Sequence, residues 1–248
     1  MAEVLAISPH PDDLEIFCGG TVATLTAKGY KVALLDLTAG ELSTQGDLQT
    51  RAKETAEASN ILGLSARENA ALPDGALNEL DLSQVETVVA AIRKHRPELL
   101  LLPYWEDRHP DHQQASRLGS RAAFMANVAK FAPNAGPKHH IKQIAYYQLR
   151  TRFTPSFVVD VSAAYETKLA SIRAFKSQVN RDEKAGSTLV SSPLSLSSIQ
   201  ARDEHYGSMI GVKYGEGFIV RTALSISDPM AFFRANPVLE PLASPEVL

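Results

Sequence analysis

Two short stretches of the sequence, each built on a His-Pro-Asp triplet, gather side chains that can bind a metal or move protons. The candidate residues are His10, Asp12, Asp13, His109, Asp111 and His112. Two neutral imidazoles and one carboxylate are suitable ligands for a catalytic zinc ion that keeps one position open for water. Zinc lowers the pKa of that water to about 7. A spare carboxylate can then take its proton, and a spare histidine can stabilise the oxyanion or protonate the leaving group.

Each triplet directly follows an apolar run that has the length of a strand. Residues 3–8, EVLAIS, precede the first triplet. Residues 98–103, ELLLLP, precede the second and are uninterruptedly apolar, which is typical of a strand buried on both faces. In open parallel sheets, ligands bind beyond the carboxyl ends of the strands. If the two strands are neighbours, we expect the six side chains to converge in one crevice.

Strand-length runs alternate with stretches of helical period throughout the first half of the chain. The pattern predicts a strand at 31–38, a helix at 48–64, a helix that starts at Leu82 and is stopped by Pro97, and a further helix that begins at Pro110. This order predicts an α/β fold: a Rossmann-like, mostly parallel sheet with right-handed crossovers and helices on both faces.

The second half is less regular, and we expect an irregular α+β C-terminal part. The pattern indicates strands at 143–149 and 156–162, a helix at 164–178 and a serine-rich loop at 187–198, in which Ser192-Pro193 could open a helix. No linker or internal repeat divides the chain. We expect one domain over 1–235 and a proline-rich tail at 236–248 that is a candidate for disorder.

Composition narrows the class of protein. The chain has 248 residues, of which 44% are hydrophobic, enough for one large domain with a core. Its net charge of −3 does not suggest a nucleic-acid or membrane surface. The start, MAEVLAIS, lacks the basic region of a signal peptide. The single cysteine, Cys18, cannot form an internal disulfide and is expected to be a small buried apolar residue. These features favour a cytoplasmic protein.

Competing explanations of the same residues are weaker. A lone His-Pro-Asp triplet is most often a loop turn whose aspartate caps a helix, but two triplets after two strands favour a shared site. The glycine pair at 19–20 lacks the phosphate-loop patterns and indicates close backbone packing. There is no Gly-x-Ser-x-Gly elbow of a serine hydrolase. The histidines expected to be surface or structural residues are His95, His139, His140 and His205.

The same motifs carry a resemblance to a known family. SPHPDDLEIFCGGTVA at 8–23, followed by RHPDH at 108–112, resembles the PIG-L/LmbE family of zinc-dependent N-acetylglucosaminyl deacetylases. TAGELSTQG, TRAKETAEASNILG, LPDG at 72–75, FVVDVS, AFKSQ and YGSMIGVKYGEGF agree with it as well. The resemblance covers most of residues 3 to 220. Within the family the chain is most similar to the bacillithiol-biosynthesis deacetylases, which remove acetyl from N-acetylglucosaminyl-malate.

The resemblance implies a role for five of the six candidate residues. His10, Asp13 and His112 match the zinc ligands of the family. Asp12 matches its general base. His109 matches the histidine that stabilises the tetrahedral intermediate and serves as an acid.

The resemblance also implies how the substrate is held. Arg51 and Arg108 match positions that face the substrate in the family, and a guanidinium suits an anionic group because it pairs bidentately with a carboxylate. The expected partner is therefore a small N-acetyl amino sugar, with no nucleic acid or membrane partner. Members of this group are often hexamers, so a homo-oligomer is expected. The stretch QGDLQ at 45–49 departs from the family pattern beside this crevice.

Three alternatives remain open at this stage. The enzyme could act on another N-acyl sugar, such as a chitin fragment or an antibiotic precursor. A protein that binds a metal or a sugar without turnover is a second alternative, although binding alone requires neither Asp12 nor His109. The metal is also open, because two histidines and an aspartate suit iron or cobalt as well as zinc.

Overall fold

The structure of the protein, a computed structural model, describes residues 1–43, 46–179 and 195–236. The strands are β1 (Val4–Ser8), β2 (Val32–Asp36), β3 (Ala66–Asn69), β4 (Leu99–Pro103), β5 (Gln143–Tyr147), β6 (Phe157–Asp160) and β7 (Gly215–Ile219). The α-helices are α1 (Asp13–Ala27), α2 (Leu48–Leu62), α3 (Leu82–His95), α4 (Pro110–Ala126), α5 (Tyr165–Ala174), α6 (Lys176–Val179), α7 (Ser195–Met209) and α8 (Pro229–Ala235). Short 3₁₀ helices occupy Pro133–Ala135 and Ser162–Ala164.

The strands form one mixed sheet in the order β3-β2-β1-β4-β5-β7-β6. The first five strands in this order run parallel, and β7 pairs antiparallel with both β5 and β6. The predicted α/β fold with a mostly parallel sheet is therefore confirmed. The antiparallel strands at one edge account for the irregular C-terminal part.

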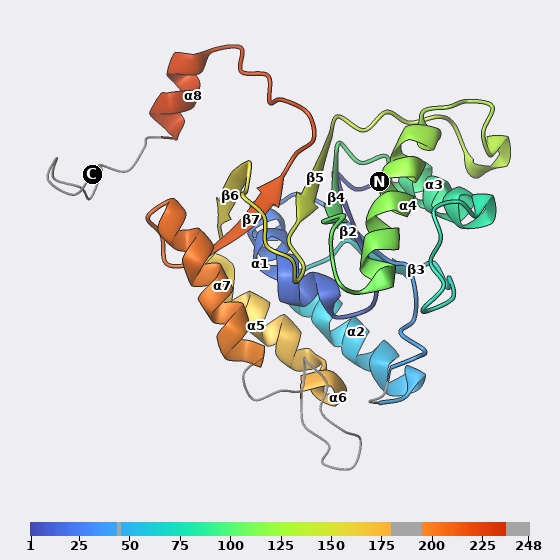
Figure 1. Ribbon diagram of the computed structural model, residues 1–248, viewed down its shortest axis with the longest axis horizontal. Coiled ribbons are helices and arrows are strands. Elements are labelled where there is room, and N and C mark those ends of the chain that lie inside the picture. The colour runs from blue at the N-terminus through green and yellow to red at the C-terminus, as the bar shows by residue number, and fades with distance from the viewer. Residues whose placement is uncertain (44–45, 180–194, 237–248) are drawn as a thin grey trace, which may run out of the picture.

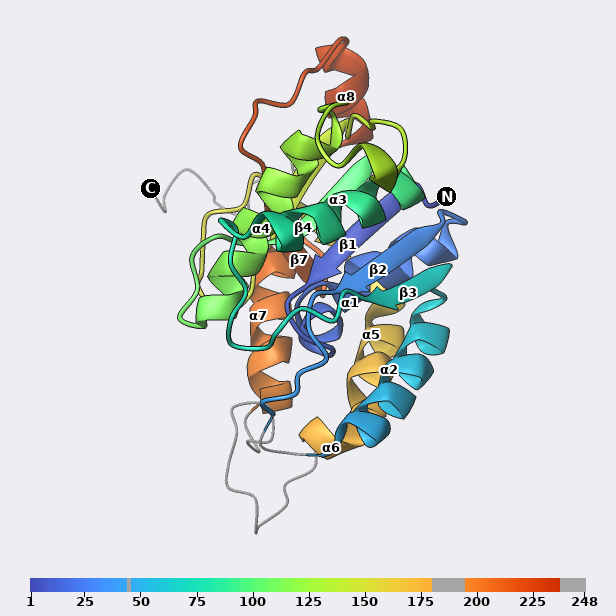
Figure 2. The same ribbon diagram turned by 90° about the vertical axis from the view of Figure 1, so that its right-hand side faces the viewer.

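Side chains that alternate along the strands build a core on each face of the sheet. On β1, Leu5 and Ile7 pack into a cluster with the apolar residues of α3 and α4. Val4 and Ala6, on the other face of the same strand, pack against α1. Figure 2 shows α3 and α4 on one side of the sheet and α1, α2, α5 and α7 on the other. Both faces are covered, which explains why β4, and β1 up to Ser8, are apolar.

The position of the site follows from the strand order. The chain leaves β1 through α1 on one face, and it leaves β4 through α4 on the opposite face, although β1 and β4 are paired neighbours. Such a reversal opens a crevice beyond the carboxyl ends of the two strands. The two His-Pro-Asp triplets follow these two strands. Because the strands are neighbours, the triplets can face one crevice, as the sequence pattern required.

The glycine pair in α1 permits a close approach of the sheet edge, as predicted. A Cβ atom at Gly20 would lie 2.8 Å from Cβ of Val161. The carboxylate of Glu216, on β7, accepts hydrogen bonds from the backbone N–H groups of Gly20 (2.9 Å) and Thr21 (2.7 Å). Cys18, on the same helix, is fully buried, as expected for a small apolar residue.

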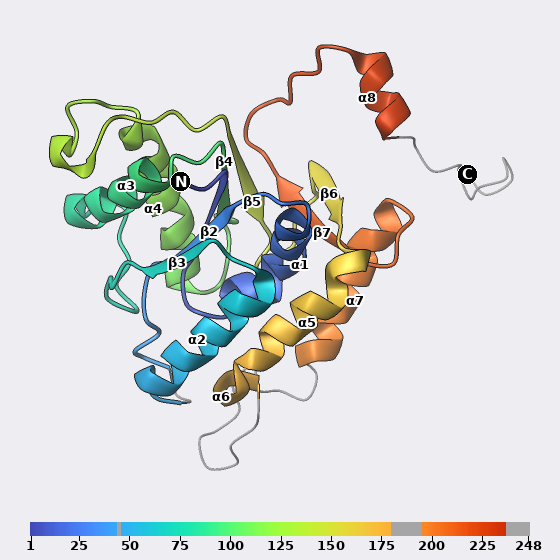
Figure 3. The same ribbon diagram turned by 180° about the vertical axis from the view of Figure 1, so that it is seen from behind.

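The C-terminal part differs from the prediction in places. Residues 195–198 were expected in a serine-rich loop, but they form the first turn of α7; the Ser192-Pro193 pair lies outside the described residues. Strands β3 and β7 were not predicted. Helix α8 stands apart from the body at the end of an exposed segment (Figures 1 and 3). Nearly all of the predicted tail, from residue 237 onward, lies outside the described residues. Within the described residues, no helix could cross a membrane.

Candidate metal and active site

Donor atoms from His10, Asp13 and His112 meet beyond the ends of β1 and β4. Asp13 Oδ2 lies 3.0 Å from Nδ1 of His10 and 3.2 Å from Nε2 of His112. The three donor atoms all lie within 4.8 Å of one another. Two imidazole nitrogens and a carboxylate oxygen form a donor set that suits a divalent transition metal. The fold thus brings together the three residues that the family resemblance implies as ligands.

Carboxylates surround His10 on both of its ring nitrogens. Its Nε2 lies 3.1 Å from Oδ1 of Asp74 and 3.4 Å from Oδ2 of Asp111. Burial lowers the pKa of His10, but hydrogen bonds with its three carboxylate neighbours outweigh burial and raise this pKa to about 12. A position that favours positive charge so strongly suits a bound cation. Asp74 and Asp111 would then orient the ring through the nitrogen that does not face Asp13.

His112 has an orienting carboxylate of its own. Its Nδ1 lies 3.1 Å from Oδ1 of Asp107, which is buried. Burial lowers the pKa of His112, whereas the charge of Asp13 and the hydrogen bond of Asp107 raise it, and the net result is about 9. A carboxylate on the second nitrogen fixes both the tautomer and the direction of a ligand imidazole.

Asp12 lies beside these donors in an unusual backbone conformation. Its φ of 108° places it in the left-handed region, which aspartate seldom adopts. Oδ2 accepts a hydrogen bond of 3.1 Å from Nη2 of Arg51, whose second bond goes to the carbonyl of Pro11. Burial raises the pKa of Asp12 to about 6, although the charge of Arg51 opposes this shift. The hydrogen bond from Arg51 therefore fixes the Asp12 carboxylate in position, and burial increases its affinity for a proton, as a general base requires.

His109 caps α4 and stands at the opening of the site. Its ring stacks on that of His112, with centroids 4.5 Å apart, and lies 5.1 Å from the ring of His10. Nδ1 accepts a 3.3 Å hydrogen bond from the backbone N–H of Asp111, so a neutral ring carries its proton on Nε2. Burial and the charges of His112 and His10 lower the pKa of His109. The ring thus presents an N–H donor for an oxyanion.

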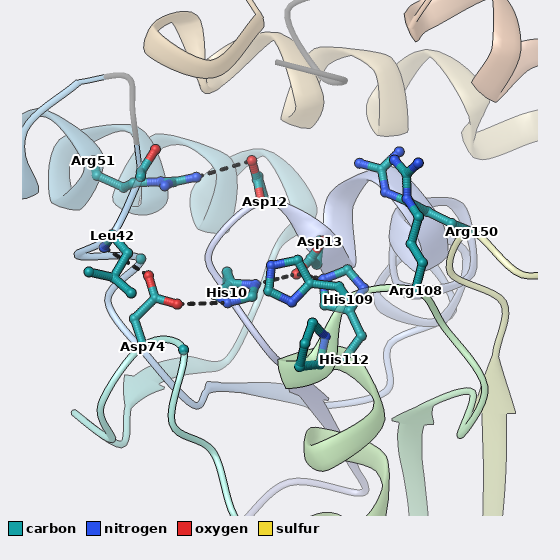
Figure 4. Close-up of a pocket in the computed structure, with 14 residues that line it drawn as sticks. His10, Asp12, Asp13, Leu42, Arg51, Asp74, Arg108, His109, His112 and Arg150 are labelled. Atoms are coloured by element: carbon teal, nitrogen blue, oxygen red, sulfur yellow. Dashed lines mark hydrogen bonds and ion pairs between the residues drawn. The ribbon is translucent and has the colours of Figure 1, made fainter.

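The donors and the catalytic candidates line one cavity of about 680 Å³. Figure 4 shows Arg51 at one end of the row of His and Asp side chains, beside Asp12, and Arg108 and Arg150 at the other end. Both arginines predicted to face the substrate, Arg51 and Arg108, line this cavity. Arg51 is buried and held by Asp12, while Arg108 is exposed.

Comparison with known proteins identifies the family. The model of the PIG-L family, described as GlcNAc-PI de-N-acetylase, matches residues 5–123, which contain both triplets. The diacetylchitobiose deacetylase of Thermococcus kodakarensis is 32% identical over 238 residues, which cover 87% of this chain and 81% of that protein. The chain belongs to the PIG-L family.

Two further proteins are similar to this PIG-L chain over most of its length. A probable N-acetyl-alpha-D-glucosaminyl L-malate deacetylase 2 of Bacillus cereus is 27% identical over 187 residues, which cover 71% of this chain and 83% of that protein. The crystal structure of the conserved protein TT1542 from Thermus thermophilus superposes with a TM-score of 0.83 at 36% identity, covering 91% of this chain and 98% of that one. PIG-L deacetylases use a metal, and the donors of His10, Asp13 and His112 fit one.

The motifs did not reveal every residue of this PIG-L site. Asp107, Asp74 and Arg150 were not singled out, although the first lies within the stretch WEDRHPDH and the second within LPDG. Asp111 was a candidate without a role, and it proves to be a partner of His10 Nε2. The LPDG motif was a usable signal for Asp74. Arg150 carried none, because it follows a strand whose place next to β4 is set by the tertiary fold.

Proposed function

We propose that this protein is a zinc-dependent deacetylase that hydrolyses the N-acetyl group of an N-acetylglucosaminide. The observation that carries the proposal is the meeting of the His10, Asp13 and His112 donors next to Asp12, in a cavity that also presents His109. Deacetylase relatives that span most of the chain support the same reaction. A protein that only binds a metal would need neither a carboxylate of raised pKa nor a histidine donor at the cavity.

The residues of the site suggest how an amide is cleaved. Bound to His10, Asp13 and His112, zinc would supply an acidified water and polarise the acetyl carbonyl. Asp12 takes a proton from the attacking water, whose oxygen bonds to the acetyl carbon. The Nε2–H of His109 donates to the oxyanion that develops, an interaction that commonly contributes about 3 kcal/mol. The C–N bond then breaks, the amine leaves with the proton that Asp12 had taken from the water, and acetate and the free amino sugar are the products.

For the substrate we propose N-acetylglucosaminyl-malate, as in bacillithiol biosynthesis. The malate group carries carboxylates, and the exposed guanidinium of Arg108 at the cavity can bind one of them. Arg51 remains a proposed substrate-binding residue. Its hydrogen bond to Asp12 also positions the carboxylate that we propose as the base. The Bacillus cereus relative bears the name of this activity.

A second candidate substrate is diacetylchitobiose, a neutral chitin fragment. The observation that favours it is the 32% identity with the Thermococcus kodakarensis deacetylase over 87% of this chain. An antibiotic precursor is a further N-acyl sugar within the same class of reaction. The choice among these substrates depends on the cavity beyond the metal donors.

Metal analysis combined with an acetate assay tests the proposal. Purified protein should contain about one zinc per chain and release acetate and a free amine in equal amounts from N-acetylglucosaminyl-malate. Diacetylchitobiose and other N-acyl sugars complete the panel. Protein that carries the metal but releases acetate from no member of the panel would contradict the proposed reaction. Release only from a neutral member would replace malate by that substrate.

The predicted oligomeric state and cellular location of the enzyme are part of the same proposal. A hexamer and a cytoplasmic location are predictions from the sequence. Light scattering coupled to size-exclusion chromatography tests the hexamer, and fractionation of source cells tests the location. A monomer at micromolar concentration would contradict the predicted assembly without affecting the reaction.

A further inference from the structure

The guanidinium groups of Arg108 and Arg150 have no acidic partner in the part of the chain that the structure describes. Both side chains line the cavity of the site, and they project in the same direction in Figure 4. Arg150 is partly buried, and its guanidinium carbon lies 5.8 Å from the centroid of the Phe17 ring. Two like charges that face one cavity repel each other unless an anion joins them.

The acidic residues of the cavity are already engaged elsewhere. Asp12 pairs with Arg51 at 3.1 Å. Asp13 lies between the two ligand imidazoles, and Asp74 is paired with His10 at 3.1 Å. None of these pairs involves Arg108 or Arg150, so the end of the cavity at which these two arginines lie is left positively charged (Figure 4). That end therefore attracts an anion from solution.

Asp107 fixes the backbone at Arg150 and next to Arg108 relative to the metal donors. Its Oδ1 accepts from the backbone N–H of His109 (2.9 Å), next to Arg108. Its Oδ2 accepts from the backbone N–H of Arg150 (2.9 Å). The same carboxylate holds Nδ1 of His112 at 3.1 Å. One buried group thus joins the loops after β4 and β5 to a metal ligand, so the cationic end is built at a set position from the reacting centre.

We propose that Arg150, together with Arg108, binds an anionic group of the substrate beyond its N-acetylglucosamine ring. Arg150 is then a specificity-determining residue that favours a carboxylate-bearing glycoside over a neutral one. The chemistry is a charge-assisted hydrogen bond from a planar guanidinium to a carboxylate. This inference rests on the proposed deacetylase function and adds to it the class of aglycone and the residue that selects it.

Comparing Arg150→Gln with wild type on a charged and a neutral substrate tests the proposal. The kcat/KM for N-acetylglucosaminyl-malate should fall about tenfold, mainly through KM, because one charge-assisted interaction is lost. The kcat/KM for diacetylchitobiose should change by less than about twofold, since nothing anionic meets Arg150. Arg152→Gln is the matched control, because Arg152 follows closely on the same loop but does not line the cavity. It should change neither value. Equal losses on both substrates, or none on either, would overturn the role of Arg150.

A binding measurement separates this inference from the proposed reaction. Calorimetric titration of L-malate into zinc-loaded protein should give a Kd about tenfold weaker for Arg150→Gln than for wild type and for Arg152→Gln. Metal content and thermal midpoint should be the same in all three proteins. If acetate is released from no substrate but the Kd ratio holds, the deacetylase function fails and the anion site stands. If the Kd values of the three proteins agree, the anion site fails whatever the activity.

Discussion

Oδ2 of Asp13 lies 3.2 Å from Nε2 of His112, although the two residues belong to different βα units. This contact exists because β1 and β4 are neighbours whose following helices lie on opposite faces of the sheet. The third donor, Nδ1 of His10, is 3.0 Å from the same oxygen. A metal at this point would therefore bind the two halves of the crevice together.

Removal of the metal should abolish turnover reversibly. A chelator should reduce acetate release from wild type to background, and added zinc should restore it. In His112→Ala, one of three ligands is lost, so zinc affinity and kcat/KM should each fall by about a hundredfold or more. The measurement is zinc per chain after dialysis, together with acetate release. Full activity in chelator-treated, zinc-free protein would contradict a metal mechanism.

Asp12→Asn should separate chemistry from metal binding. The amide cannot accept a proton, so kcat should fall by about 10²- to 10⁴-fold. Zinc content should be unchanged, because the donors of His10, Asp13 and His112 are intact. Stopped assays of acetate release on protein of known zinc content measure both. Near-normal turnover in the zinc-loaded variant would exclude Asp12 as the base.

His109→Ala should show a similar pattern for a different reason. The ring is the proposed donor to the oxyanion, and loss of one such donor costs about 10²- to 10³-fold in kcat. The ring does not belong to the group of mutually close donors formed by His10, Asp13 and His112, so zinc should be retained. If the variant is purified without zinc under conditions in which Asp12→Asn keeps it, His109 is a ligand and the assignment is wrong.

The sequence points to the candidate site through local signals. A strand, a His-Pro-Asp triplet and a helix start lie within a few residues of one another at His10 and again at His109. Burial in a parallel sheet makes β4 a continuous apolar run, which is easy to recognise. The sequence pattern does not show that β1 and β4 are neighbours, so the convergence of the two triplets remains conditional until the strand order is known.

The elements that were missed lack such local signals. β3, with the sequence AREN, is a polar strand that is defined by its pairing with β2. β7 contains two glycines, which usually weaken a strand. At Gly217, a Cβ atom would lie 2.7 Å from the ring of Tyr206, so a packing partner on α7 requires the glycine. Asp107 and Arg150 were missed for the same reason, since their roles arise from contacts between separate loops.

The cap of α3 should make part of the stability depend on acid pH. Asp81 accepts hydrogen bonds from the hydroxyl (2.7 Å) and the backbone N–H (2.9 Å) of Ser83, and these bonds lower its pKa. A carboxyl whose folded pKa is lowered stabilises the fold above its unfolded pKa, near 4. That contribution is lost as the pH falls through the folded pKa.

Urea unfolding of wild type and Asp81→Ala at several pH values checks this dependence. The difference in midpoint should be constant from pH 7 to about pH 5 and should shrink below about pH 4. A difference that stays constant to pH 3 would mean that the charge of Asp81 contributes nothing and that the loss comes from helix geometry alone.

The buried ion pairs of Lys168 should be far more important for folding than an exposed pair of the same type. Lys168 is fully buried, with Nζ 2.7 Å from Glu216 and in contact with Asp203. Because Glu216 also holds α1, this network connects the C-terminal helices to the helix that carries Asp13. In Lys168→Met, Glu216 would stay buried without a cation and Asp203 would keep only its pair with Arg202 (2.8 Å), so the free energy of unfolding should fall by about 3–5 kcal/mol.

Lys142→Met is the matched control, since its pair with Glu98 has a similar distance, 2.8 Å, but both side chains are more than half exposed. Its cost should be about 0–1 kcal/mol because solvent screens the pair. Urea unfolding of the zinc-loaded proteins at one pH measures both values. Equal losses in the free energy of unfolding for the two variants would show that the buried pairs of Lys168 stabilise the fold no more than an exposed pair does. A large cost for Lys168→Met that is accompanied by normal zinc binding in the folded fraction would show that the network secures the fold without shaping the donors.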